Sequence, residues 1–427
     1  MFTNLLTYYS NPVVLEQILS HAKNREVSVA LENGGHMTRP NVLVYERDIL
    51  ELVRKGATSF HGTVEHWKNP LLLRTGISSA DMKDLRTGWD MIIDIDSSIG
   101  LDASKLAALR VLDLLRSYGV EATVKFSGNR GFHIGVPWES LPKTIDYEPA
   151  THQFPKVPRI VASYIKETVK DRLFADLKKS KGSLHELMEE LGDVQATTLS
   201  PYLFVDIESN WGERHLFRLP YSLNEKTWLA SVPLARTELD SFKIEYASPE
   251  RAVKYKPQGF LAPGGDADSL VVAAMDWHAS RVKEERKETT KHVKRTKEVP
   301  ESVFPPCIKL IMGGLADGRK RSVLVLVNFL QQMNWPWEKI DAAVREANAK
   351  NKPPLSDTYV NTQLNWFRRS AETGRSLLPP NCANDAFYTG YNICQPDERC
   401  KRGTETIQIK NPVSYPFAGV SRKLIKG

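Results

Sequence analysis

Two aspartates at the end of an apolar run, Asp94 and Asp96, are the side chains of this sequence best placed to do chemistry. In a β-strand the side chains of residues i and i+2 point to the same face, so both carboxylates would project together. Like charges held this close repel one another unless a cation lies between them. Hard divalent cations such as Mg2+ take oxygen ligands and commonly arrive with substrate phosphates. The pair therefore favours metal-dependent phosphoryl chemistry, although acid pairs of this kind also cap strands or begin loops.

A glycine-containing segment follows at residues 125–133, with the sequence KFSGNRGFH. Its two glycines allow a tight turn, and the exposed backbone N–H groups of such a turn favour anions. Ser127 can donate a hydrogen bond, Arg130 offers a guanidinium fork for phosphate, and His133 can donate to a phosphate oxygen. One interpretation is a phosphate-binding turn; the other is a hairpin with polar surface residues and a hydrogen-bonded histidine.

A third acid, Asp206, lies among apolar neighbours and ends a predicted strand. Such an acid can complete a carboxylate cage for a cation, or it can simply cap the strand. Further along the chain, Arg218, Ser222 and Lys226 are spaced to supply phosphate contacts.

Apolar spacing predicts the elements that must position these residues. Strands are expected at 88–96, 121–126, 132–137, 203–207 and 216–219. Helices are expected at 12–23, 44–55, 102–118, 159–191 (a pair broken at 181–183), 271–286, 321–334, 337–350 and 358–370. The strand–helix–strand–turn–strand order around the acid pair suggests an α+β core.

The 427 residues suggest two or three domains, and the net charge of +7 favours a polyanionic partner such as nucleic acid. The sequence contains no run of about 18 apolar residues, and its start lacks the pattern of a signal peptide. We therefore expect an intracellular, cytoplasmic protein that does not enter a membrane. In a reducing location, the four cysteines are better explained as metal ligands or free thiols than as disulfides.

The C-terminal third has a different composition. Residues 287–301 are rich in Lys and Arg and nearly lack apolar side chains, so we expect a solvated linker and a domain boundary there. Beyond it, Cys307 stands apart from Cys382, Cys394 and Cys400. Four thiolates can hold zinc or an iron–sulfur cluster, although this spacing fits neither a paired zinc ribbon nor a ferredoxin. Four unrelated buried thiols are the alternative.

The order of the N-terminal motifs resembles the archaeo-eukaryotic primases, most of all their small, catalytic subunit. Acid-x-acid is followed by Ser-Gly-x-x-Gly-x-His, then by a lone acid, then by Arg-Leu-Pro-x-Ser-Leu-x-x-Lys-Thr. The likeness spans about residues 1–233 and includes the segments 8–9, 24–27, 59–61 and 69–70.

This resemblance implies an RRM-like catalytic core with a mixed sheet and flanking helices. It implies that Asp94, Asp96 and Asp206 hold two Mg2+ or Mn2+ ions for nucleotidyl transfer. The residues that it places around the incoming nucleotide are Ser127, Arg130, His133, Arg218, Lys226 and Arg25. Asn224 stands where the family often has a histidine, so this position departs from the pattern.

Many small subunits carry a zinc-binding cluster soon after the acid pair, but residues 97–119 contain neither Cys nor His. We therefore expect no zinc site in the catalytic domain. The four cysteines instead resemble those of the C-terminal domain of the primase large subunit, over about residues 302–417. That resemblance implies a mainly α-helical domain in which Cys307, Cys382, Cys394 and Cys400 hold a [4Fe–4S] cluster, with zinc as the alternative.

Two short segments of this region, 318–321 and 366–369, resemble the part of that domain that faces nucleic acid. The resemblance implies that Arg319, Arg321 and Arg368 contact phosphates and that Trp366 stacks on bases. A Trp-Phe pair on a helix is as often part of a core, so this assignment has a structural alternative.

The two likenesses together predict a single-chain primase. Its expected parts are a catalytic domain at 1–286 with a helical insertion at about 159–191, a linker at 287–301 and a cysteine domain at 302–427. The expected activity is template-directed transfer from NTPs or dNTPs that starts primers de novo on single-stranded DNA. The alternatives are a repair or gap-filling polymerase that only extends primers, and a nucleic-acid-binding protein with a decayed site. We expect a monomer, with a replicative polymerase or helicase as a further candidate partner.

Overall fold

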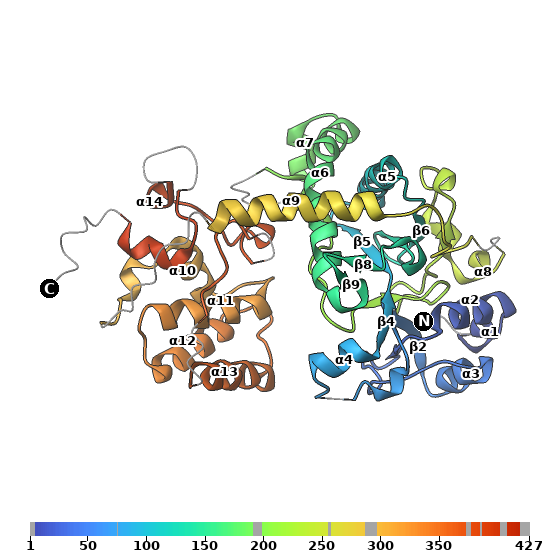
Figure 1. Ribbon diagram of the computed structural model, residues 1–427, viewed down its shortest axis with the longest axis horizontal. Helices are drawn as coiled ribbons and strands as arrows, with labels where there is room; N and C mark the ends of the chain where they lie inside the picture. Colours follow the sequence, from blue (N-terminus) through green and yellow to red (C-terminus); the bar gives the residue numbers. More distant parts are fainter. Residues whose placement is uncertain are drawn as a thin grey trace. The chain divides into compact units, whose positions relative to one another are not determined.

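The computed structural model describes residues 5–74, 76–190, 199–254, 258–286, 297–372, 377–384, 387–401 and 408–418. The chain forms two compact units (Figure 1), the first from residues 1–193 and 200–288 and the second from residues 194–199 and 289–427. Each unit contains a large hydrophobic core of its own.

A five-stranded sheet in the order β10-β5-β7-β6-β12 forms the centre of the first unit. Its strands are β5 (Met91–Ser97), β6 (Thr123–Phe126), β7 (Phe132–Val136), β10 (Val205–Ile207) and β12 (Pro233–Leu234). Helix α5 (Leu101–Ser117) carries the chain from β5 to β6, and β7 then inserts between those two strands. Helix α6 (Lys156–Lys181) returns the chain to β10 on the other side of β5. This order is the split β-α-β arrangement of a β-α-β-β-α-β core.

Two expectations about this core were wrong. The sheet was expected to be mixed, but all of its described strand pairings are antiparallel. Strands β5 and β6 do run parallel, as a helical crossover requires, yet β7 lies between them and prevents parallel pairing. Residues 159–191 were expected to be an insertion, but α6 is the second helix of the core because it links β7 to β10.

The single strand expected at 88–96 is divided at Asp90. Its first half, β4 (Arg86–Trp89), pairs with β3 (Glu65–Trp67), whereas β5 enters the central sheet. The side chain of Asp90 is 1% exposed, and its Oδ1 accepts a hydrogen bond from the backbone N–H of Trp138 at 2.7 Å. A polar residue thus divides an apolar run because its buried carboxylate bonds to neighbouring segments.

A second, three-stranded antiparallel sheet consists of β1 (Val27–Leu31), β2 (Ala57–Thr63) and β11 (Leu216–Arg218). Helices α1 (Leu5–Tyr9), α2 (Pro12–Ala22) and α3 (Glu46–Arg54) accompany it. Helix α2 begins where Asn11 caps the N–H of Val13 and Pro12 takes the first helical position. The hydroxyl of Tyr9 donates to the Thr58 carbonyl at 2.7 Å and fastens α1 to β2.

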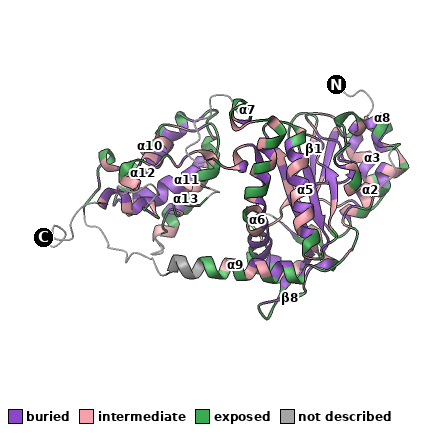
Figure 2. Ribbon diagram, turned by 90° about the horizontal axis from the view of Figure 1, so that it is seen from above, coloured by how far each residue is buried: buried purple, intermediate pink, exposed green. Residues whose placement is uncertain are grey.

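The other helices of the first unit cover its sheets. Helix α5 packs against β5, β7 and α6, and α6 in turn packs against α9 (Asp268–Arg286). Figure 2 shows that buried residues concentrate on the strands and on one side of α5 and α6. The minor elements are α4 (Ser79–Leu85), α7 (Leu184–Glu189), α8 (Pro249–Ala252), the hairpin of β8 (Thr144–Ile145) and β9 (Glu148–Pro149), and the 3-10 turns η1 (Pro70–Leu72), η2 (Trp138–Ser140), η3 (Ala150–Gln153), η4 (Pro201–Leu203), η5 (Arg236–Glu238) and η6 (Ile244–Ala247).

The second unit is helical. Its elements are α10 (Pro306–Met312), α11 (Arg319–Gln332), α12 (Trp337–Ala349), α13 (Asp357–Glu372), the short α14 (Glu398–Lys401) and the 3-10 turns η7 (Glu301–Val303), η8 (Thr389–Tyr391) and η9 (Pro412–Phe417). Helices α10 to α13 pack on one another around a core that includes Phe304, Phe329 and Phe367. The expected helical character of this region is confirmed.

The expected linker at 287–301 falls partly outside the description, since residues 287–296 are not among the described ones. Its last residues already belong to the second unit. Val299 is 9% exposed, its N–H donates to the Met333 carbonyl at 3.0 Å, and its carbonyl accepts from the indole of Trp335 at 2.8 Å. The free part of any linker therefore ends before Val299.

Candidate active site and cysteine pocket

The acid pair lies on β5, between strands that bring further polar side chains to the same face. Asp94 lies opposite His133 of β7, and His133 lies opposite Lys125 of β6. Two residues along β5, Asp96 lies opposite Asp206 of β10. Because residues i and i+2 of a strand share a face, all five side chains project from one face of the sheet. The structure thus brings Asp206 beside two aspartates that lie more than 100 residues earlier in the sequence.

A fourth acid, Glu208, escaped the sequence reasoning. It lies two residues beyond Asp206, and its backbone N–H donates to the Asp94 carbonyl at 2.9 Å, which places Glu208 opposite Asp94. After burial, the charge of Glu208 is the strongest of the influences that raise the pKa of Asp94. The sequence did carry a signal, because residues 206–208 repeat the acid-x-acid pattern of residues 94–96. Two acid-x-acid strands therefore run side by side.

Each of the three aspartates has a basic side chain near it. The pairs are His133 Nε2 to Asp94 Oδ1 at 3.5 Å, Arg130 Nη2 to Asp96 Oδ2 at 3.0 Å and Lys166 Nζ to Asp206 Oδ1 at 3.6 Å. Within the described parts of the chain, no three acidic, histidine or cysteine side chains converge closely enough to hold one metal ion. The strand register already sets the backbone positions, so a bound cation requires side-chain rotation away from these bases rather than backbone movement.

The acids repel one another, and the pKa of Asp94 shows this repulsion most clearly. Removal from water raises the pKa of Asp94, and the charges of Glu208, Asp96 and Asp206 raise it further, to about 7, against the opposing charge of Lys125. The side chains of Asp94 and Asp96 remain 43% and 46% exposed, so a cation can reach them from solvent. Clustered carboxylates that repel one another and face solvent fit hard divalent cations.

Glu208→Gln is expected to stabilise the metal-free protein by up to about 1 kcal/mol, because like charges opposite each other on neighbouring strands are destabilising and the amide can keep the contact that Glu208 makes with His215 Nε2 at 3.3 Å. The same change should reduce the stabilisation that Mn2+ gives. Thermal unfolding in EDTA and in Mn2+ measures both effects. Glu121→Gln, at an exposed position at the start of β6, is the matched control and should change neither. An unfolding temperature in EDTA that falls for Glu208→Gln would contradict the placement of this carboxylate.

The glycine-rich turn at 127–131 lies directly against β5. A Cβ atom on Gly131 would lie 1.8 Å from the carbonyl oxygen of Ile95, so only glycine fits there. Gly128 has a φ of +98°, and the N–H of Ser127 donates to the Gly131 carbonyl at 3.0 Å to close the turn. This close approach is what delivers the exposed Arg130 to the acids of β5.

Arg218 lies near Asp94 and Lys125 but is largely engaged by its own surroundings. Its guanidinium donates to the Ser59 hydroxyl and to the Leu223 carbonyl at 2.8 Å, and it forms an ion pair with Glu225 at 2.9 Å. The expected phosphate contact from Ser222 was wrong, because this side chain is fully buried and its hydroxyl accepts a hydrogen bond from a backbone N–H of β2 at 2.7 Å.

Asn224 supports the loop that lies against the glycine-rich turn. Its Oδ1 accepts hydrogen bonds from the backbone N–H groups of Lys226 and Thr227 at 2.9 and 3.1 Å. The Thr227 hydroxyl then donates to the Gly128 carbonyl at 2.5 Å. Asn224 thus shapes the loop, while the side chain of Lys226 is exposed and free of this framework.

Arg25, expected near the nucleotide, is a structural residue here. It is 5% exposed, pairs with the buried carboxylate of Asp90 and donates to the carbonyls of Thr63 and Val64 at 2.7 and 3.0 Å. The Arg25 guanidinium lowers the pKa of Asp90 far below its usual value, against the effect of burial. A guanidinium committed to a buried ion pair is not available to a phosphate.

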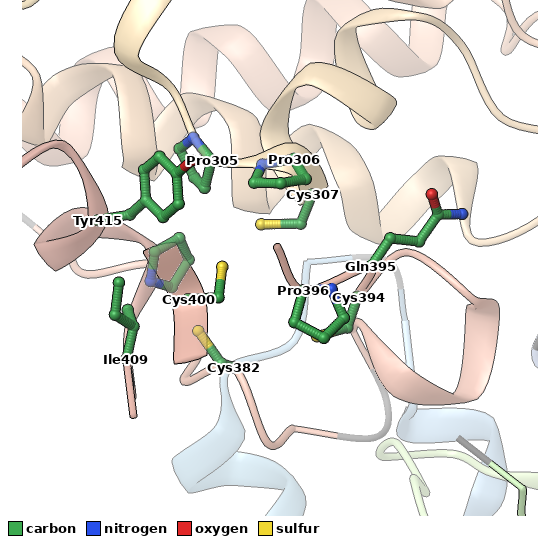
Figure 3. Close-up of a pocket in the computed structure, with 11 residues that line it drawn as sticks. Pro305, Pro306, Cys307, Cys382, Cys394, Gln395, Pro396, Cys400, Ile409 and Tyr415 are labelled. Carbon is green, nitrogen blue, oxygen red and sulfur yellow. The ribbon is translucent and has the colours of Figure 1, made fainter. Parts of the chain in front are cut away.

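The four cysteines line one pocket of the second unit (Figure 3). Cys307 begins α10, Cys400 lies in α14, and Cys382 and Cys394 lie in loops. None of the four forms a disulfide with another described residue. Figure 3 shows the sulfur atoms of Cys307, Cys382 and Cys400 directed toward the same space, which four prolines and the ring of Tyr415 also border. Segments more than 70 residues apart therefore meet at this pocket.

The thiols are close enough to affect one another. Burial raises the pKa of Cys307 well above its usual value, and the charges of Cys382, Cys394 and Cys400 raise it further. Burial and two of the neighbouring thiols raise the pKa of Cys382 to about 12. Thiols held together in an apolar pocket are reluctant to ionise unless a cation is present to receive the thiolates.

The residues expected to face nucleic acid are distributed over two helices. On α13, Trp366 is 54% exposed and packs edge-on against Phe367, with ring centroids 4.9 Å apart, while Phe367 enters the core. Arg368 of the same helix is exposed. On α11, Arg319 donates to a backbone carbonyl at 2.5 Å, and Arg321 donates to a tyrosine hydroxyl. Of the Trp-Phe pair, Phe367 therefore lies in the core and Trp366 lies at the surface.

Residues 3–183 of the chain match the family described as LigD, primase-polymerase domain. The N-terminal part of this chain carries a primase-polymerase domain. The family uses divalent metals, and such a domain suggests a nucleotidyltransferase. The match includes Asp94, Asp96 and the turn with Arg130 and His133, and it ends before Asp206.

Two relatives add to this finding. The DNA primase small subunit PriS of Pyrobaculum aerophilum is 31% identical over 189 residues, which are 38% of this chain and 57% of that protein. The uncharacterized protein MJECS07 of Methanocaldococcus jannaschii is 41% identical over 58 residues, 13% of each chain. This chain therefore spans little more than half of the length of the PriS relative.

Solved structures show only distant similarity. The polymerase domain of Mycobacterium tuberculosis Ligase D in complex with DNA covers 59% of this chain and 87% of its own, with 16% identity and a TM-score of 0.40. The primase RepB′ covers 85% of this chain and 99% of its own, with 14% identity and a TM-score of 0.31.

Among the described helices, none combines the length and the apolar character that crossing a membrane requires.

Proposed function

We propose that this chain is a primase, which joins nucleotides on a single-stranded DNA template and starts primers without an existing 3′ end. The observation that supports it best is the pairing of two acid-x-acid strands, residues 94–96 and 206–208, beside a glycine-rich turn that carries Arg130. Carboxylates for cations and anion-binding groups for a triphosphate then lie side by side on one face of the sheet.

Asp94, Asp96 and Asp206 supply the oxygen ligands in this proposal. Two bound divalent cations would activate the 3′-hydroxyl of the primer and neutralise the charge that develops as pyrophosphate leaves. Arg130 contacts Asp96 at 3.0 Å, and a cation that takes Asp96 would leave the guanidinium for a phosphate group. Lys166 stands in the same relation to Asp206. Together with Ser127 and His133, these side chains hold the triphosphate in place.

For the second unit, we propose that Cys307, Cys382, Cys394 and Cys400 hold a [4Fe–4S] cluster, with zinc as the second candidate. Zinc bonds of about 2.3 Å in a tetrahedron bring thiolates to within about 4 Å of one another. No three of the described thiols converge that closely, although all four border one pocket. A cluster with several iron atoms is larger than a single ion, so its thiolate ligands need not converge on one point.

The two units complement each other during initiation. A primase must hold a template and two nucleotides without the stacking and pairing that an existing primer provides. We propose that the second unit binds the template through Trp366 and Arg368, which are exposed on α13, and thereby supplies the missing binding energy. Because the two units share one chain, their effective concentration for each other stays high. A replicative polymerase or helicase is a further candidate partner.

Primer synthesis without a primer is the decisive test. The full-length protein is incubated with single-stranded DNA, NTPs or dNTPs and Mn2+, and we expect dinucleotides and longer products. Running the reactions with each nucleotide class separately also establishes which sugar is preferred. If products form only when an annealed primer is supplied, the protein is a gap-filling polymerase. If neither reaction proceeds while DNA is bound, the second rival, a nucleic-acid-binding protein, is correct.

A further inference from the structure

Lys125 is a fully buried lysine that the proposed reaction does not use. Its relative exposure is 0%, and it lies on β6, which β7 separates from the acid-bearing strand β5. Among the described residues, the contacts of its Nζ are the Ser231 hydroxyl at 2.6 Å, Nδ1 of His133 at 2.9 Å and the faces of two aromatic rings, those of Phe217 and Phe260 at 5.9 and 5.4 Å. Burying a lysine is costly, so a function is to be sought in these contacts.

The neighbouring groups determine the direction of the hydrogen bonds around Nζ. The Ser231 hydroxyl donates its proton to the Phe126 carbonyl at 2.7 Å, so it can only accept from Lys125. On the other side, Nε2 of His133 lies 3.5 Å from a carboxylate oxygen of Asp94. A lysine ammonium has no acceptor, so Nδ1 of a neutral imidazole must accept from Nζ, which leaves the proton on Nε2 beside the carboxylate. Lys125 then donates to both Ser231 and His133.

We propose that Lys125 is a positioning residue: by donating from Nζ to Nδ1, it holds His133 as the Nε2–H tautomer, with that N–H aimed beside Asp94. This inference rests on the proposed function, in which His133 donates to the triphosphate. Ammonium and amine forms of lysine both have at least two N–H groups, one for each acceptor, so the arrangement does not depend on the charge of Lys125. The opposite tautomer would turn a lone pair toward the carboxylate and toward an incoming phosphate.

The tautomer can be read directly by NMR of full-length protein labelled with 15N-histidine. The His133 signals are assigned by their absence from a His133→Gln sample. We expect Nδ1 of His133 to resonate in the unprotonated range and Nε2 in the protonated range, without metal or nucleotide. A proton on Nδ1 in the wild-type protein overturns the proposal, and this measurement requires no variant of Lys125 to fold.

Two substitutions separate the hydrogen bond from packing. Lys125→Met keeps the chain length and apolar contacts but removes the donor, and Lys125→Gln restores a neutral donor with two N–H groups. We expect the Met variant to populate the Nδ1–H tautomer and to bind a nucleoside triphosphate with Mn2+ about ten-fold more weakly, as when an orienting partner is lost elsewhere. The Gln variant should keep the wild-type tautomer and most of the affinity.

Lys143→Met is the matched control. Lys143 also lies over an aromatic ring, that of Trp138 at 4.1 Å, and donates to a backbone carbonyl. It does not contact the acid cluster, which consists of Asp94, Asp96, Asp206 and Glu208. It should change neither the His133 signals nor nucleotide affinity. If Lys125→Met is folded and its His133 spectrum equals that of the wild type, the proposal is refuted. If the tautomer shifts as expected but no variant or wild-type protein binds nucleotide, the proposed function fails while the positioning role of Lys125 stands.

Discussion

The Asp94→Asn/Asp96→Asn variant is expected to lose nucleotide incorporation by about three orders of magnitude or more. Asparagine keeps the shape of aspartate but removes the charge that draws a divalent cation. Charge stabilisation by cations is worth several kcal/mol in this kind of chemistry, and each 1.4 kcal/mol corresponds to about a ten-fold change in rate. Incorporation is measured with a primed template in Mg2+ and in Mn2+, so that extension is tested apart from initiation.

The same variant should be at least as stable as the wild type in EDTA. Neutral side chains remove the repulsion that raises the pKa of Asp94, so the unfolding temperature is expected to stay level or rise. Loss of activity together with retained stability would separate a metal-binding role from a structural one. Asp102→Asn, at a carboxylate that is 92% exposed on α5, is the matched control and should retain full activity. Wild-type rates in the double variant would refute the proposed mechanism.

The cysteine pocket should give the second large effect. We expect protein purified without oxygen to be brown and to contain about four iron atoms per chain. Replacing Cys382 and Cys400 with serine should abolish iron binding and strongly destabilise the second unit, because the energy of binding a structural metal centre is also folding energy. Iron analysis, visible absorbance and thermal unfolding of the full chain measure these outcomes.

In this experiment, primed extension tests the activity of the first unit independently of the second. The acid cluster lies wholly in the first unit, so the serine variant should keep primed extension while losing synthesis without a primer. Gln395→Ala, which changes a pocket-lining residue without a thiol, serves as the control and should retain the cluster. Colourless wild-type protein with one zinc ion per chain would exclude iron–sulfur, and a stable metal-free protein would exclude both metals.

Periodicity along the chain predicted most elements well. The helices at 12–22, 101–117, 319–332 and 337–349 begin and end within two residues of their expected limits, because caps, glycines and apolar spacing are local signals. The division of the expected strand at Asp90 was missed because its cause, a contact with Arg25 and Trp138, comes from distant segments. The mixed sheet was wrong for the same reason, since strand order is not a local property.

The candidate site divides in the same way. Asp94, Asp96, Asp206 and the turn with Arg130 were all identified from residue type and spacing, and the structure places them together. Arg25 and Arg218 have the right chemistry for phosphate, but carboxylates of the fold engage both of them. Glu208 and Lys166 were missed because their relevance depends on which strand and helix lie beside the aspartates.

By itself, the sequence determined which groups could carry charge and which turns required glycine, because these depend on residue type and on neighbours close along the chain. It thereby determined that a metal-dependent phosphoryl site was to be expected around Asp94 and Asp96. Only the tertiary structure decided which acids oppose one another and which basic side chains are exposed, because strand register and burial arise from contacts between distant segments. Lys125 shows this most plainly, as an ordinary lysine in the sequence that the fold buries against His133.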